Sequence, residues 1–170
     1  MKKRIYVAKV DGQSYAYLEE VLKLLRVETG EVVDGVKQYA VLNNDEAIAA
    51  MMPGGVWHEI DVVEDLTGRH EAKVEGLLSE MSEADKATYV GLPSGNVKQE
   101  AVGKIRNRRW PAIVVTVVVK SWTFDAPLTE DGIEDLPLDV KNLLVNYCAK
   151  RFNVGDHPAF LKSAWSRLDN

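Results

Sequence analysis

The sequence is short of cysteine. Cys148 is the only one among 170 residues, so no disulfide can form within the chain, and a reducing compartment is expected. Long apolar runs are also missing, because residues 112–119, with Thr116 among them, fall far short of the ~20 residues that span a bilayer. The basic residues 1–4 precede no continuous apolar segment. We therefore expect no signal peptide and no membrane anchor, but a cytoplasmic protein.

An excess of positive charge is absent as well. Lysine and arginine number 21 against 26 aspartates and glutamates, which gives a net charge of −5. Binding to phosphates requires a basic face, so the overall charge argues against nucleic acid as the main partner. The apolar fraction of 46% and the charged fraction of 28% are those of an ordinary folded protein rather than a disordered one.

The common catalytic and metal-binding motifs are missing too. No Walker A, G-x-G-x-x-G or G-x-S-x-G sequence occurs, and His70 starts no H-E-x-x-H motif because position 74 is valine. In a strand, Glu59 and Asp61 share one face while His58 points to the other, a poor arrangement for a metal ion. We expect no catalytic site, no metal site and no cofactor.

The remaining candidates for chemistry have simpler structural explanations. Cys148 lies on the apolar stripe of a helix, where a buried thiol packs as a small apolar group with a raised pKa. The acidic pairs at 130–131 and 134–135 suit helix N-termini, because the helix dipole favours negative charge there.

Hydrophobic periodicity and turn residues predict a helix-rich α+β fold. Strands are expected at 5–10, as a pair or one bent strand within 32–42, and at 56–63. Helices are expected at 15–26, 44–52, 68–81, 97–109, 137–152 and 158–168. The polar residues 82–95 predict a surface connection. Residues 111–121 fit a buried strand or a buried helix, with Pro111 at its first position under the second alternative.

The order of these elements indicates two parts. Residues 1–55 would form a small α/β module, closed by the breaker Pro53-Gly54-Gly55, and residues 56–170 a mainly helical domain on which it packs. A module this small is near the lower limit for independent folding. The alternative is one continuous domain.

A basic run beside an aromatic residue is the one local feature with functional promise. It contains Lys104, Arg106, Arg108 and Arg109 and ends at Trp110. Such a cluster can bind phosphates and stack on a base. Alternatively, it forms a solvated helix face that complements acidic segments of this protein or of a partner, and Trp110 anchors a protein interface.

Residues 117–129 contain Trp122 and Phe124 and end in Pro127-Leu128-Thr129, and residues 132–140 contain Leu136-Pro137. Here an apolar segment leads into a Trp-containing turn, a Pro-Leu-Thr cap and a helix opened by Leu-Pro. This pattern resembles tail assembly chaperones and related tail-gene products of tailed phages. Residues 66–71 resemble the short Gly-Arg-acid turns of such proteins, and together the segments cover about a fifth of the chain.

The resemblance implies a non-enzymatic phage protein that assists tail assembly by binding tape-measure or tail-tube proteins and is commonly absent from the finished virion. One alternative is a structural virion component, such as a neck or connector subunit. Another is a nucleic-acid-binding or host-modulating protein that uses the basic run. The candidate partner contacts are Trp110, Trp122, Phe124 and Trp165. Trp165 would either plug the last helix onto the core or anchor a partner.

Overall fold

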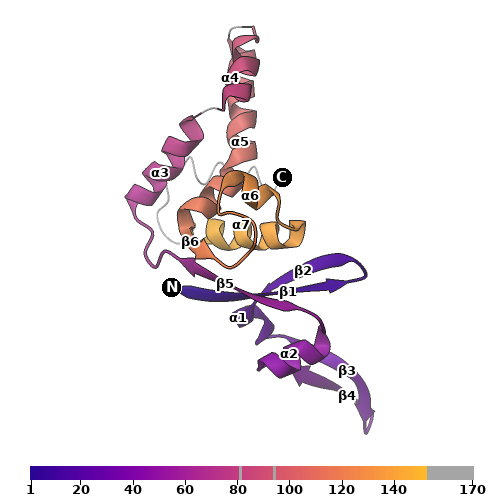
Figure 1. The fold of residues 1–170 in the computed structure, drawn as a ribbon. Helices are drawn as coiled ribbons and strands as arrows, with labels where there is room; N and C mark the ends of the chain where they lie inside the picture. The colour runs from indigo at the N-terminus through magenta and orange to yellow at the C-terminus, as the bar shows by residue number, and fades with distance from the viewer. Residues whose placement is uncertain (81, 94, 153–170) are drawn as a thin grey trace.

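A four-stranded antiparallel sheet lies at the centre of the molecule (Figure 1). The computed structural model describes residues 1–80, 82–93 and 95–152. Helices cover one face of the sheet, and two short helices with a separate β-hairpin lie beyond the other (Figure 1). The helix-rich α+β class expected from the sequence is confirmed.

The central sheet draws its strands from distant parts of the chain. Its order is β2-β1-β5-β6, and every neighbouring pair is antiparallel. The strands are β1 (Lys2–Val10), β2 (Gln13–Leu18), β5 (Val56–Val62) and β6 (Val119–Trp122). Pairing of β1 with β5 crosses the boundary expected at residue 55. The sheet is therefore continuous between the two expected parts, which fits the alternative of one continuous domain.

Strand β1 carries apolar side chains on both faces, because successive side chains of a strand point in opposite directions. Ile5 packs toward the helices, in the larger apolar cluster. Tyr6 and Ala8 point to the other side, where they form a smaller cluster. Its other buried members are Leu22 of α1, Leu42 between β4 and α2, and Ile48 of α2. Two cores thus share one strand.

Four helices lie on the first side of the sheet: α3 (Gly68–Ser79), α5 (Asn96–Val118), α6 (Glu130–Glu134) and α7 (Leu138–Phe152). Helices α5 and α7 contact its strands, and α3 and α6 pack on α5. The C-terminal half of α5 is nearly all buried. The stripe expected on α7 is confirmed, since Val140, Leu144 and Cys148 recur at four-residue spacing and are buried. The N-terminal half of α5 and helix α4 (Glu83–Val90) project from the body as an arm (Figure 1).

Segment 111–121, for which the sequence allowed either a buried helix or a buried strand, forms both in succession. Helix α5 continues to Val118, and strand β6 begins at Val119. Pro111 lies inside the helix rather than at its first position, which corrects that expectation. The burial of the residues that follow stabilises the helix here, despite the N–H that proline lacks.

Two other local predictions were wrong. The helix expected at 15–26 is instead strand β2, the four-residue helix α1 (Glu19–Leu22) and the start of β3. The turn Asp11-Gly12, with both φ angles positive, joins β2 to β1, and pairing with β1 overrides the helical spacing. The expected connection at 82–95 contains helix α4, whose first turn is capped by the Ser82 hydroxyl accepting from the Asp85 N–H at 3.1 Å.

The strand pair expected around Asp34-Gly35 is confirmed, but it is longer than the range 32–42. It consists of β3 (Arg26–Val33) and β4 (Val36–Val41), so most of β3 lies before residue 32. Helix α2 (Asp45–Met51) is capped by the Asn44 side chain, and α6 by Thr129. The helix expected at 158–168, with Trp165, lies outside the described residues.

Two glycines in helices predict opposite effects of the same substitution. A methyl group at Gly132 would overlap the Pro127 carbonyl oxygen, and one at Gly103 would meet nothing within 4 Å. We expect Gly132→Ala to lower the free energy of unfolding by about 1–3 kcal/mol through overpacking. Gly103→Ala should raise it by up to about 1 kcal/mol through helix propensity. Chemical denaturation of both variants checks this; equal effects would contradict the packing at Gly132.

Candidate partner-binding surface

The arginines of the basic run lie beside acidic side chains from distant segments. Arg106 donates to both carboxylate oxygens of Glu75 in α3, at 2.6 and 2.8 Å. Arg108 donates to both oxygens of Asp85 in α4, at 3.1 and 3.0 Å. The Arg108 hydrogen bond is the main cause that lowers the pKa of Asp85. These ion pairs attach α3 and α4 to α5.

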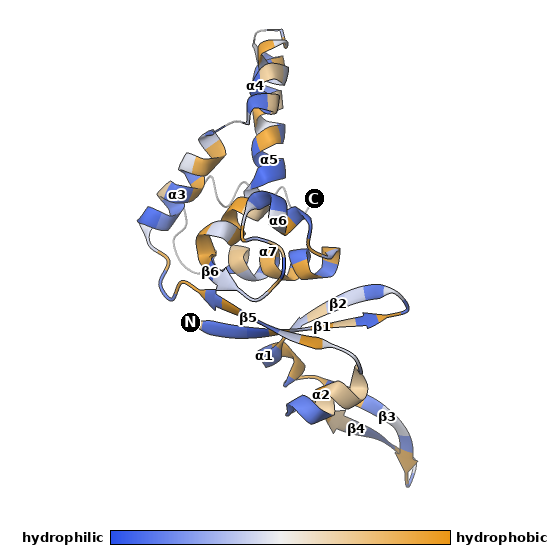
Figure 2. Ribbon diagram, in the orientation of Figure 1, coloured by the Kyte–Doolittle hydropathy of each residue, from blue (hydrophilic) through white to orange (hydrophobic). Residues whose placement is uncertain are grey.

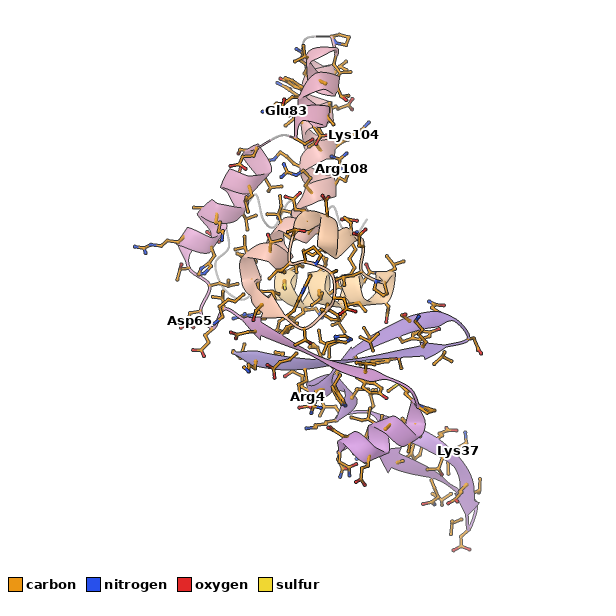
Figure 3. The ribbon with its side chains drawn as sticks, viewed as in Figure 1. Arg4, Lys37, Asp65, Glu83, Lys104 and Arg108 are labelled. Carbon is orange, nitrogen blue, oxygen red and sulfur yellow. The ribbon has the colours of Figure 1, made fainter. Side chains whose placement is uncertain are left out.

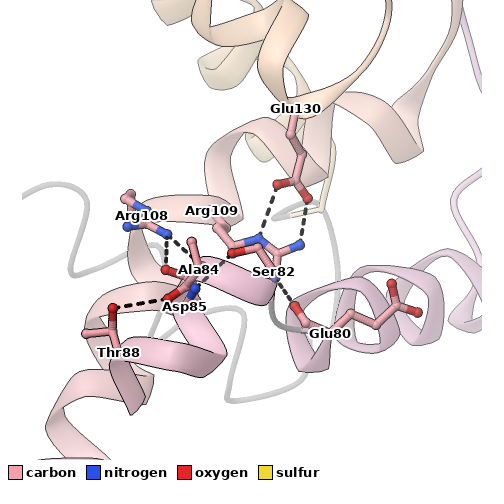
Figure 4. A network of polar contacts seen from close by, with 8 residues as sticks. All are labelled: Glu80, Ser82, Ala84, Asp85, Thr88, Arg108, Arg109 and Glu130. Atoms are coloured by element: carbon pink, nitrogen blue, oxygen red, sulfur yellow. Dashed lines mark hydrogen bonds and ion pairs between the residues drawn. The ribbon is translucent and has the colours of Figure 1, made fainter. Parts of the chain in front are cut away.

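Arg109 joins three segments (Figure 4). Its guanidinium binds both carboxylate oxygens of Glu130 at the start of α6, at 3.1 and 2.8 Å, and donates to the Glu80 carbonyl after α3. The hydrogen bond with Glu130 is the main cause that raises the pKa of Arg109. An adjoining cleft of about 470 Å³ is lined by side chains of both signs.

The basic run is therefore largely neutralised within the molecule. Lys104 is exposed on the projecting arm (Figure 3) and has no ion pair among the described residues. One free lysine makes a small phosphate-binding face, since each neutralised phosphate requires its own cation. The pairing fits the alternative in which the run complements acidic segments of the same protein.

Trp122 and Phe124 hold the loop after β6 onto the main core. The Trp122 indole N–H donates to the Ala126 carbonyl at 2.8 Å, and the two rings meet edge to face at 5.4 Å between centroids. Phe124 also stacks on His58 of β5 at 4.3 Å. Both aromatic side chains are half-buried against the larger cluster. Both rings therefore plug the loop onto the core, and only the exposed part of each is available for the partner contact expected from the sequence.

The other tryptophans of the candidate set have different positions. Trp110 is 3% exposed and belongs to the larger core, so its side chain is not available as an anchor on this surface. That placement corrects the expectation of an interface residue and follows from its position where α5 enters the body. Trp165 lies outside the described residues.

The structure also places the groups considered for chemistry. Burial raises the pKa of Cys148 to about 12, so its thiol stays protonated at neutral pH, as its position on the α7 stripe predicts. In the described part of the chain, no cluster of three histidine, cysteine, aspartate or glutamate side chains could hold a metal ion. No helix there is long and apolar enough to cross a membrane.

Exposed apolar side chains are concentrated in the part of the chain that forms α1, the β3–β4 hairpin and α2. Figure 2 shows apolar residues along this hairpin and α2. Of the fifteen large apolar side chains exposed in the described part, nine lie within residues 21–51, less than a fifth of the chain. They are Val21, Leu24, Leu25, Val32, Val33, Val36, Tyr39, Val41 and Met51. We call these nine residues the hairpin surface. Sequence reasoning missed it, because valines in a strand ordinarily indicate a buried face.

The register of the hairpin separates an inner face from an outer one. Val27 and Ala40 are opposite each other and half-buried, and Val27 packs on the smaller cluster. Side chains alternate along β4, so Tyr39 and Val41 point to the outer face. Both are about half exposed, at 53% and 48%. The hairpin thus packs the part of its inner face near Val27 on the smaller cluster, and it leaves the outer face and the turn end exposed to solvent.

Arg4 connects the central sheet to the helices beside the hairpin (Figure 3). Its guanidinium lies over the Trp57 ring at 3.9 Å and binds Asp45 of α2 at 2.9 Å. It also pairs with Glu19 of α1. The hydrogen bond from Arg4 is the main cause that lowers the pKa of Asp45. One cation thereby joins β1, β5, α1 and α2. These contacts help to hold α1 and α2, which carry part of the hairpin surface, against the central sheet.

Comparisons with known proteins yield no relative. No family model, no curated protein and no solved structure matches the chain. The interpretation of the hairpin surface therefore depends on its own side chains, charges and backbone groups.

The Arg108–Asp85 pair predicts a pH dependence of stability. Because the pKa of Asp85 is lowered by folding, its charge stabilises the protein above its unfolded pKa of about 3.9, and this contribution disappears as the pH falls through the folded value. We expect Asp85→Asn to reduce the loss of Tm below pH 4. Asp65→Asn is the control, since Asp65 forms no ion pair in the described part. Parallel thermal melts that coincide for wild type and Asp85→Asn would contradict this.

Proposed function

We propose that this chain is a non-enzymatic phage protein that assists tail assembly by binding tape-measure or tail-tube proteins in the cytoplasm of the infected cell. The observation that carries the proposal is the hairpin surface, where nine large apolar side chains are exposed within 31 consecutive positions, residues 21–51. Apolar side chains gathered in this way typically mark a site of protein association.

The chemistry of the hairpin surface suits a protein partner. Tyr39 offers an aromatic ring and a hydroxyl, and tyrosine is enriched among the residues that dominate binding energy. Charged residues of the same strands, Glu28 and Lys37, lie beside it and form an ion pair of 3.2 Å. Apolar contacts bordered by polar groups are the usual composition of a protein interface.

The resemblance to tail assembly chaperones supports the same proposal from another part of the chain. Its residues 117–140 comprise the end of α5, β6, the Trp122 loop, α6 and the start of α7. Within the described structure these residues join the helices to the sheet, so the pattern is carried by the scaffold. Partner contacts are then expected outside it, on the hairpin surface.

Co-expression with the tape-measure and tail-tube proteins tests the proposal. We expect the tagged chain to retain at least one of them, and Leu24→Ser with Val32→Ser to reduce retention at least tenfold, about 1.4 kcal/mol of binding free energy. Both positions are exposed, at 83% and 63%, so the fold should tolerate the changes. Leu138→Ser, at a 71% exposed position on α7, is the matched control.

Retention of neither protein by the wild type, together with tails of normal length and number after gene deletion, would overturn the proposed function. Mass spectrometry of purified virions separates the chaperone from the structural alternative. Absence from virions is the expected result. Stoichiometric presence would instead indicate a neck or connector subunit.

A further inference from the structure

The β3–β4 hairpin has a regular backbone edge with which no third described strand pairs. The two-residue turn Asp34-Gly35, with φ angles of 51° and 78°, places Val33 and Val36 as the first hydrogen-bonded pair. Backbone groups of β4 therefore alternate, and those of Lys37, Tyr39 and Val41 point away from β3. An isolated two-stranded hairpin is marginally stable, so further pairing would stabilise it.

The two edges of the hairpin are not equivalent. On β3 the register shifts between Glu28 and Val32, and Gly30 there adopts a φ of 83°. Such bulges bend a strand and prevent further pairing. Strand β4 has no bulge and no proline across Val36–Val41. Its single charge is Lys37, whose ammonium group already binds Glu28. The β4 edge is therefore the one open to another strand.

We propose that β4 pairs with β4 of a second copy of this chain, antiparallel and about a two-fold axis at Tyr39. In this register Tyr39 lies opposite Tyr39 of the second copy, and Lys37 lies opposite Val41. The aromatic pair is favourable, and no like charges face each other. Shifting the strands by four residues would place Lys37 opposite Lys37, which charge repulsion disfavours. The register about Tyr39 thus places the aromatic pair at the centre of the contact and keeps the two lysines apart.

The resulting dimer has a four-stranded sheet in place of two hairpins. Its outer face carries Tyr39 and Val41 from both copies, because residues opposite each other in a sheet share a face. Contact along one short strand is small beside the ~1,600 Å² of a standard stable interface, so the association is weak and depends on concentration. It concerns the chain alone and is independent of the proposed partners.

Cysteine cross-linking of the purified full chain tests the register. Residues opposite each other in a hydrogen-bonded antiparallel pair have Cα atoms about 5.5 Å apart, within the range of a disulfide. Tyr39→Cys should therefore form covalent dimers under mild oxidation. Val36→Cys is the matched control, since Val36 is at least as exposed as Tyr39 but lies about 20 Å from its counterpart in this register. The native Cys148 is buried and does not interfere. Equal cross-linking at both positions, or none at Tyr39→Cys, would overturn the proposal.

Light scattering gives a second, non-covalent test. The mass of the wild type should rise toward that of two chains as its concentration approaches about 1 mM. Tyr39→Glu and Tyr39→Lys should each remain monomeric, because like charges then meet at the axis, and an equimolar mixture should associate again. A single-chain mass for the wild type throughout, or no recovery in the mixture, would refute self-pairing. Neither result depends on retention of tail proteins, so this proposal and the proposed function can fail separately.

Discussion

Burial of strand β1 on both of its faces is the constraint on which the rest of the structure depends. Ile5 belongs to the core under the helices, and its neighbour Tyr6 belongs to the smaller core on the opposite side. The Tyr6 hydroxyl donates to the Met52 carbonyl at 2.6 Å, and a side chain at Gly55 would overlap its ring. One strand therefore positions the helical body, and also α2 and the hairpin beside it.

Local signals predicted the elements that depend on neighbouring residues. The helices expected from residues 44 and 68, and the cap expected at Thr129, lie within a residue of where the sequence predicts them, because capping involves only the next few residues. The helix expected at 15–26 failed for the opposite reason. Its apolar spacing is helical, yet pairing with β1 through the Asp11-Gly12 turn determines the conformation. Residues 111–121 change from helix to strand at Val119, where pairing with β5 begins.

The basic run shows how tertiary contacts change the meaning of a charge pattern. In the sequence, Arg106, Arg108 and Arg109 form one cationic segment suited to phosphates. In the structure their carboxylate partners are 31, 23 and 21 residues away, on three different helices. No local pattern predicts such pairs. The segment holds the molecule together, and the candidate interface lies instead on a hairpin that periodicity alone would assign to a core.

The same physical reasoning links the two ends of the molecule. Around α5, the three arginines of the basic run are paired with carboxylates and the aromatic Trp110 is buried, so most of the run is used inside the molecule. At the hairpin, the inner face packs on the smaller core while the outer face and the β4 edge are left exposed. Because the ion pair between Arg4 and Asp45 joins the sheet to α2, this surface is carried on a well-anchored support. Exposed apolar side chains that gather on such a support are the feature by which the two ends of the described structure differ most.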